Sequence, residues 1–312
     1  MPELPDVELY VLRARKYLVG QVLRRVKLLS PFVLRTARPP LTGAEGRRVG
    51  GVERLGKRIV LALPASPDAP QPSQPDLWLV IHLMIAGRLR WLAQGGKPPG
   101  RITLALLEFD AGTLVLTEAG SKRRASLHLV DSREALVALD AGGVDVLKFD
   151  VGGTPVAQLD AAAFAQRLKQ ENHTLKRALT DPRIFSGIGN AYSDEILHRA
   201  RLSPLALTKT LPEADAERLH GAALAVLGEW AARLAAESPG WPKKVTAFHP
   251  QMAVHGRHGQ PCPVCGSPVQ RIVYAENECN YCARCQTGGK LLADRALSRL
   301  LKASWPKSLD EL

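Results

Sequence analysis

The chain has 312 residues, enough for two domains with cores of their own, and its 46% hydrophobic and 23% charged residues are ordinary globular composition. No run of 18 apolar residues and no signal-peptide pattern occurs, which argues against a membrane protein and predicts a cytoplasmic one. Lys and Arg outnumber Asp and Glu by 42 to 30, and this net charge of +12 favours nucleic acid as partner over an anionic membrane.

The first eight residues, MPELPDVE, place a candidate nucleophile next to a carboxylate. Removal of Met1 would make Pro2 a terminal secondary amine, whose reference pKa of about 8 lies close to neutrality. Such an amine can attack a carbonyl carbon and form an iminium, and Glu3 is placed to carry protons for it. The structural alternative is a proline-stiffened helix start, with Asp6 and Glu8 near the positive end of the helix dipole.

Residues 7–18 have the apolar spacing of an amphipathic helix, and Gly20 follows its end. Short apolar runs between Gly and Pro residues come next, and they predict a β-sandwich or barrel. These runs cover residues 21–29, 51–63, 77–83, 88–92, 101–109 and 113–117. The Pro-rich stretch 64–75 predicts an exposed loop between two strands.

A helical half begins near Leu159, after a Gly-Gly-Thr-Pro linker at residues 152–155. Its predicted helices cover residues 161–170, 173–179, 191–200 and 212–236. The sequence thus predicts an α+β multidomain protein. Its parts are a β-sandwich domain with flanking helices over residues 1–150, a helical domain over 151–250, a cysteine module over 251–290 and a tail over 291–312.

All five cysteines fall between residues 262 and 285, whereas a secreted disulfide framework would spread them. Two CxxC pairs, Cys262 with Cys265 and Cys282 with Cys285, are 16 residues apart and have the spacing of a four-thiolate zinc site. They predict one structural Zn²⁺ that folds a hairpin and does not catalyse. Cys279 also forms a CxxC with Cys282, which leaves the alternative that Cys285 is the spare thiol.

Two glycines, Gly187 and Gly189, precede a predicted helix in the stretch SGIGNAY. Glycines let the backbone approach a phosphate, and N–H groups at a helix start attract anions, so this turn predicts a phosphate contact. An ordinary helix cap explains the same pattern. Arg257, in the basic stretch before the cysteines, is also placed to meet phosphates.

Four motifs in this order closely resemble the formamidopyrimidine-DNA glycosylase and endonuclease VIII family. They are the opening PELPDVE, the GKR around Lys57, the run TLKRALTDPRIFSGIGNAYSDEILHRARLSP over residues 174–204, and VHGRHGQPCPVCGSP followed by NYCARCQ. The resemblance implies an N-terminal β-sandwich domain, a helix-two-turn-helix module, a C-terminal zinc finger and a DNA partner.

The resemblance also implies a bifunctional DNA glycosylase and AP lyase. By this analogy Pro2 attacks C1′ of the damaged nucleoside, the base leaves, and an iminium remains. Glu3 moves protons on the sugar, and elimination then breaks the strand. Lys57 and Asn190 match residues that grip the phosphates around the flipped nucleotide, in line with the need to take that nucleotide out of the stack.

Several positions depart from the family pattern at the DNA-reading parts. In the turn that begins at His82, Ile85 stands where a methionine usually fills the gap left by the flipped base. Arg123 matches the arginine that faces the orphaned cytosine, but Ala125 replaces the phenylalanine wedge. In the zinc hairpin, Asn277 replaces a phosphate-binding arginine.

The sequence therefore predicts a base-excision glycosylase with AP lyase activity that forms a Schiff base through Pro2. We expect a monomer that acts on damaged double- or single-stranded DNA, in the cytoplasm at the nucleoid. The departures leave the preferred lesion and the opposite base open. The alternative is a DNA-binding sensor of lesions or abasic sites on the same scaffold, which does not excise bases.

Overall fold

The structure, a computed structural model, describes residues 1–65, 75–120, 122–246, 248–274, 277–293, 295–304 and 306–311. Most of the predicted Pro-rich loop 64–75 lies outside this range. The chain folds into two compact units: Met1–Ala141, Phe149–Thr154 and Ala231–Thr246 form the first, and Gly142–Lys148, Pro155–Trp230 and Ala247–Leu312 the second. The segment Ala231–Thr246 thus packs with the N-terminal residues, although it follows the helical domain in sequence.

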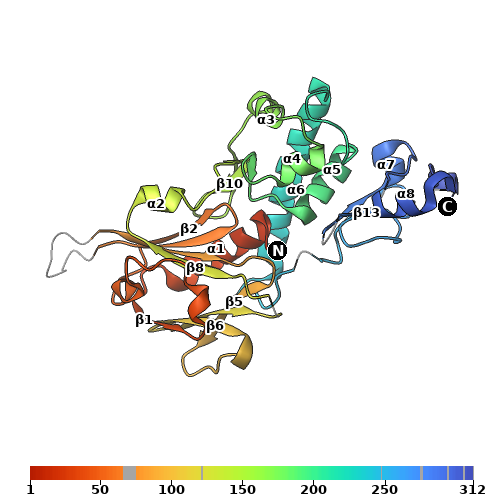
Figure 1. The fold of residues 1–312 in the computed structure, drawn as a ribbon. Helices are drawn as coiled ribbons and strands as arrows, with labels where there is room; N and C mark the ends of the chain where they lie inside the picture. Colours follow the sequence, from red (N-terminus) through yellow and green to blue (C-terminus); the bar gives the residue numbers. More distant parts are fainter. Residues whose placement is uncertain are drawn as a thin grey trace. The chain divides into compact units, whose positions relative to one another are not determined.

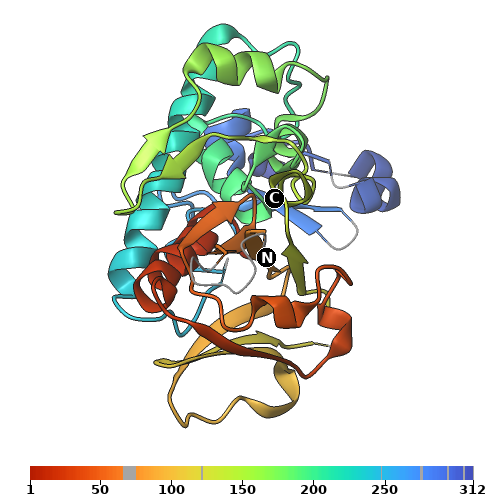
Figure 2. The same cartoon turned by 90° about the vertical axis from the view of Figure 1, so that its left-hand side faces the viewer.

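Two antiparallel four-stranded sheets build the first unit (Figures 1 and 2), as the strand pattern predicts. One sheet has the order β1 (Leu23–Leu28), β6 (Thr103–Phe109), β7 (Gly112–Glu118), β5 (Gly87–Ala93). The other has the order β2 (Gly51–Leu55), β3 (Arg58–Leu63), β4 (Leu77–His82), β8 (Ser126–Val130).

The second of these sheets is buried on both faces. Leu61 and Leu79 face the core that both sheets share, whereas their neighbours Val60 and Trp78 pack with Leu136 of the short helix α2 (Arg133–Val137). Successive side chains of a strand point to opposite faces, so a strand covered on both sides reads as a continuous apolar run. This explains the run LWLVI at residues 77–81.

Helix α1 (Leu4–Leu18) supplies one wall of the shared core through an apolar stripe that includes Val7, Val11 and Leu18. It begins three residues before the predicted start, because Pro5 fits the first turn of a helix. The predicted run 51–63 is also not one strand: it is a hairpin of β2 and β3 that turns at Gly56, whose φ is +60°.

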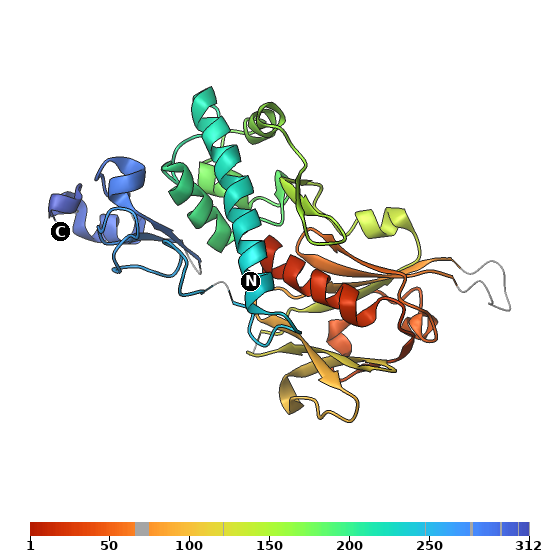
Figure 3. The same ribbon diagram turned by 180° about the vertical axis from the view of Figure 1, so that it is seen from behind.

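The second unit is mainly helical and contains a β-hairpin, which two further helices follow in the chain (Figure 3). Its helices are α3 (Ala161–Leu168), α4 (Leu175–Thr180), α5 (Asn190–Ala200), α6 (Glu213–Glu237, in this unit to Trp230), α7 (Ala283–Thr287) and α8 (Arg295–Leu301). The hairpin pairs β13 (Gln270–Tyr274) with β14 (Asn277–Tyr281). Short strands are β9 (Val144–Asp145), β10 (Leu147–Phe149, which ends in the first unit), β11 (Pro155–Ala157) and β12 (Phe185–Ser186).

Local capping explains where two of these helices begin. Asp160 accepts a hydrogen bond from the N–H of Ala163 at 2.7 Å, and Thr174 caps α4 in the same way. In the described part of the chain, no helix combines the length and the apolar character that crossing a membrane requires.

Candidate active site and DNA-binding residues

Two of the three predicted catalytic residues, Pro2 and Glu3, lie immediately before α1. Pro2 is buried, and Glu3 is only 2% exposed. The carboxylate of Asp6 accepts a hydrogen bond from the backbone N–H of Glu3 at 2.9 Å, which fixes the entry of the chain into the helix. Burial raises the pKa of Asp6 to about 7.

The amine at the start of the chain lies among charged side chains of the first unit. Burial lowers the pKa of the Met1 amine; Arg88 and Lys57 add to this effect, while Glu3 and Asp6 oppose it. These groups interact because α1, the β2–β3 turn and β5 bring them together. A lowered pKa leaves more of an amine neutral, and therefore nucleophilic, near pH 7.

Lys57 sits in the β2–β3 turn, where burial lowers its pKa and Glu3 opposes the shift. Arg54 fixes this turn from β2: its Nε donates to Glu8 at 2.6 Å and its Nη1 donates to the carbonyl of Gly56 at 2.9 Å. Both charged side chains of this pair are almost fully buried. The pair thus ties α1 to the turn that carries Lys57, a role that no local pattern in the sequence predicts.

His82 ends β4 and lies opposite Arg58 in the register of β3 and β4. Burial lowers the pKa of His82 to about 4, and the nearby cations Arg58 and Lys57, together with His128, act in the same direction. His82 is therefore neutral at pH 7 when no anion is bound. A phosphate at this position would raise the pKa again.

Ile85 stands out on a strained turn between β4 and β5. Met84 before it has a positive φ of 50°, and Ile85 itself is 58% exposed. Gly87 closes the turn, because a Cβ there would lie 2.2 Å from the carbonyl oxygen of Leu83. Arg88 donates to the carbonyl oxygens of Ile85 and Gly87, so the turn presents an apolar tip on a fixed base.

Ala125 does not occupy an exposed wedge position. It is 3% exposed and packs in the core that the two sheets share, with its N–H held by Glu118 at 2.9 Å. An aromatic ring at this backbone position would overpack that core. Arg123 is exposed, and its Nη2 donates to the carbonyl of Arg101 at 2.8 Å.

In the second unit, Gly187 and Gly189 lead into α5 as expected. Gly187 has a φ of +84°, and Gly189 is the residue before the first helical turn. Asn190 opens the helix, and its Nδ2 donates to the carbonyl of Glu278 at 2.8 Å. The predicted phosphate ligand is thus oriented by a hydrogen bond to the hairpin strand β14.

Two buried acidic residues of α5, Asp194 and Glu195, attach the loop before the cysteines to the helix, a role that the sequence also did not predict. Glu195 accepts hydrogen bonds from three successive N–H groups at residues 253–255. Asp194 contacts Nδ1 of His255 at 2.8 Å and Nζ of Lys176 at 2.5 Å. Buried carboxylates are stable when they are paired in this way, so the loop has a defined position on α5.

The four cysteines of the two predicted CxxC pairs converge, with all their Sγ atoms within 4.8 Å of one another. The Sγ atoms of Cys265 and Cys282 are 3.4 Å apart, and those of Cys262 and Cys285 are 4.0 Å apart. A tetrahedral Zn²⁺ with Zn–S bonds of about 2.3 Å requires S···S distances of about 3.8 Å, so the residues fit the ion. Four thiolates leave no position for water, and this zinc is structural.

Cys279 is buried in β14 and is not one of the four clustered thiols. The alternative in which Cys285 is the spare thiol is therefore wrong. His198 of α5 places Nε2 3.3 Å from Sγ of Cys262, where it can donate to a thiolate.

Arg257 lies in the loop before the cysteines, and its Nη1 donates to the carbonyl of Pro250. The side chain of Asn277 lies outside the described residues.

The comparisons with known proteins agree with this architecture. The formamidopyrimidine-DNA glycosylase N-terminal domain matches residues 1–136, the H2TH domain of that enzyme matches residues 152–237, and the zinc finger found in FPG and IleRS matches residues 259–288. The formamidopyrimidine-DNA glycosylase of Thermus thermophilus is 34% identical over 296 residues, which cover 93% of this chain and 100% of that protein. The chain belongs to the formamidopyrimidine-DNA glycosylase family.

Solved structures of this family share the fold. The crystal structure of the Thermus thermophilus protein matches with a TM-score of 0.71 at 33% identity, and covers 91% of this chain and 98% of that one. The Lactococcus lactis enzyme, in complex with N7-benzyl-Fapy-dG containing DNA, matches with a TM-score of 0.74 at 22% identity, over 92% of this chain and 100% of that one. The predicted family and its three-part architecture are thereby confirmed.

Proposed function

We propose that the protein is a base-excision DNA glycosylase with AP lyase activity that works through Pro2. The observation that carries the proposal is the buried carboxylate of Glu3 beside the amine end of the chain, with Lys57 and Arg88 in the same site. Removal of Met1 moves the amine to Pro2, directly next to Glu3. A nucleophile, a proton carrier and two cations are then together.

In this mechanism the Pro2 nitrogen attacks C1′ of the damaged nucleoside, and the bond from C1′ to the base breaks. The nitrogen loses its proton as the iminium forms, and the departing base takes up a proton. Glu3 moves protons on the sugar as its ring opens. Elimination then breaks the strand on the 3′ side and afterwards on the 5′ side, while Lys57 and Asn190 hold the flanking phosphates.

The substrate in this proposal is damaged double- or single-stranded DNA, bound by one copy of the chain inside the cell at the nucleoid. The exposed Ile85 fills the space of the extruded nucleotide, and Arg123 meets the opposite strand. The phosphate contacts come from Lys57, His82 and Arg257, and from the turn at residues 187–190. One structural Zn²⁺ holds the hairpin.

A panel of lesion-bearing oligonucleotides tests the function. Purified protein should nick strands that contain an oxidised pyrimidine, a ring-opened purine or an abasic site, and should leave undamaged strands intact. Each lesion is offered in single- and double-stranded form to rank the substrates. Binding to all lesions without any nicking would support the non-excising sensor instead.

DNA binding is expected to tighten as the pH falls, through His82. The pKa of His82 is about 4 without DNA, and a phosphate at the ring would bring it back towards its ordinary value near 6.5. Because the bound state then holds the proton more strongly, affinity rises as the pH falls from 7.5 to 5.5, by about tenfold. Titration of a duplex that carries an uncleavable abasic-site analogue at both pH values measures this change.

The matched variant for this prediction is His82→Gln, which stays neutral but keeps a polar side chain. The other histidine in the cluster, His128, is present in both proteins, so their difference reports on His82. An equal pH response in the variant and in the unchanged protein would show that His82 does not contact a phosphate.

A further inference from the structure

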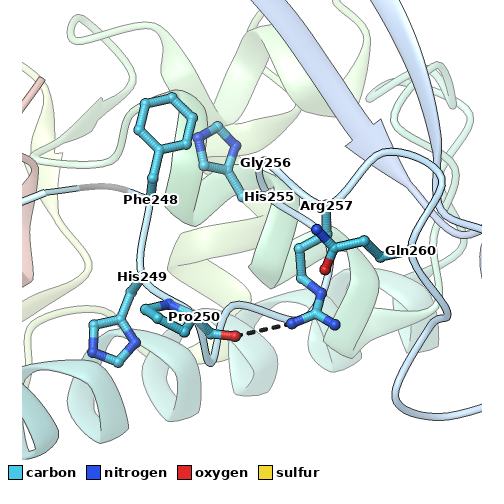
Figure 4. Close-up of a pocket in the computed structure, with 7 residues that line it drawn as sticks. All are labelled: Phe248, His249, Pro250, His255, Gly256, Arg257 and Gln260. Atoms are coloured by element: carbon cyan, nitrogen blue, oxygen red, sulfur yellow. Dashed lines mark hydrogen bonds between the residues drawn. The ribbon is translucent and has the colours of Figure 1, made fainter.

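A cavity of ≈ 140 Å³ lies in the second unit, in the loop that precedes the zinc finger (Figure 4). Of its lining residues, only Arg257 has a role in the mechanism proposed above, as a phosphate contact. Its lining combines an aromatic ring, two imidazoles and a guanidinium, contributed by Phe248, His249, His255 and Arg257. These residues lie within ten positions of one another in the sequence.

Phe248 is 68% exposed although it is a large apolar side chain. One face of its ring stacks on His255, with centroids 5.5 Å apart and planes at 20°. His255 is itself fixed by Asp194, through Nδ1, and by Glu195, through its backbone N–H. The ring of Phe248 thus stacks on a fixed neighbour while most of its own surface is exposed, as in a stacking platform.

Gly256 is needed for this arrangement. A Cβ at this position would lie 2.8 Å from Cδ1 of Phe248, and its φ of +70° disfavours other residues. The N–H of Gly256 donates to Oδ1 of Asn280 in β14 at 2.6 Å, so the backbone beneath the ring is fixed to the hairpin. The platform is therefore part of the folded unit.

Arg257 gives the cavity its charge. Its Nη1 donates to the carbonyl of Pro250, and Figure 4 shows the guanidinium lying along the same loop as the aromatic platform. Among the described residues that line the cavity, none carries a carboxylate. A largely exposed aromatic ring and a guanidinium in a lining of this kind match the recognition of a single-stranded nucleotide, whose base stacks and whose phosphate pairs with arginine.

We propose that this cavity binds one unpaired nucleotide of a DNA strand, with the base stacked on Phe248 and the adjoining phosphate on Arg257. The proposal rests on DNA being the partner, as the proposed function holds. A base inside an intact duplex is already stacked on both faces, so the cavity selects single-stranded or locally opened DNA. It gives the chain an aromatic contact with DNA that the buried Ala125 does not offer.

The test compares the full-length protein with Phe248→Ala in binding to a labelled single-stranded oligonucleotide and to a blunt, undamaged duplex. Loss of one base-aromatic contact should weaken single-strand binding about tenfold, with less than about a twofold change for the duplex. Phe248→Trp keeps an aromatic ring at this position, and it should bind the single strand as tightly as the unchanged protein does. Phe32→Ala is the matched control, because Phe32 is 79% exposed but lies in the first unit.

Arg257→Gln should lower the slope of log affinity against log salt for the single strand by about one, since one phosphate contact is lost. No change in Phe248→Ala, an equal loss on both substrates, or no single-strand binding by the unchanged protein would overturn the proposal. Cleavage of abasic DNA is measured on the same samples. If the protein cleaves abasic DNA but Phe248→Ala binds the single strand normally, only this inference is wrong. If Phe248→Ala weakens single-strand binding but the protein does not cleave, only the proposed catalytic function is wrong.

Discussion

A protein that carries a non-cleavable extension before Pro2 is expected to lose cleavage of abasic-site DNA by at least about a thousandfold. The extension turns the secondary amine into an amide, whose nitrogen lone pair is delocalised and cannot attack C1′. Binding should stay within about threefold, because Lys57 and the other proposed phosphate contacts are unchanged. Single-turnover cleavage of an abasic-site duplex, and equilibrium binding to the same duplex with an uncleavable abasic-site analogue, separate the two effects.

The control places the same extension after the C-terminus, where it should leave cleavage unchanged. A second control inserts a protease site whose cut exposes Pro2, and cutting should restore the activity. If the blocked protein cleaved DNA at the rate of the unblocked one, the nucleophile would have to be another group.

Replacement of a zinc ligand should have the second large effect. Cys282→Ala is expected to reduce bound zinc from about one equivalent to almost none and to weaken DNA binding on the order of a hundredfold. The reason is that one of the two apolar clusters of this module consists of the four cysteines together with Val254 and Val269, so that zinc binding contributes directly to its folding free energy. Without it, Arg257 and the hairpin lose their positions.

The chain offers a matched variant three residues away. Cys279→Ala also removes a buried thiol, from β14, but it should keep one zinc and bind DNA with an affinity close to that of the unchanged protein. Zinc content by mass spectrometry under native conditions, together with DNA titration, compares the two variants. Retention of zinc in Cys282→Ala and its loss in Cys279→Ala would reverse the ligand assignment.

Features that depend on neighbouring residues could be predicted from the sequence. The spacing of Cys262, Cys265, Cys282 and Cys285 is a local pattern, and the fold brings these four thiols together. The strand-rich first half followed by helices was also readable, because strand and helix periodicities differ. The exact hairpin turn at Lys57 was less clear, because β2 and β3 read as one apolar run.

Features that depend on long-range contacts could not be predicted. The ion pair of Glu8 and Arg54 joins residues 46 positions apart, and Asp194 reaches His255 across 61 positions. The sequence also did not predict the burial of Ala125. The motif shows that an alanine replaces the phenylalanine, but not that this alanine packs in the core between the sheets. The platform at Phe248 depends on a long-range contact indirectly, because Asp194 fixes the ring of His255 on which Phe248 stacks.

The most direct test of the central claim is to find where DNA becomes attached. Protein incubated with abasic-site DNA and borohydride is digested, and the cross-linked peptide is sequenced by mass spectrometry. We expect the sugar remnant on the nitrogen of Pro2, in a peptide that begins at Pro2 and lacks Met1. Attachment to a lysine such as Lys57, or active protein that retains Met1, would contradict the mechanism.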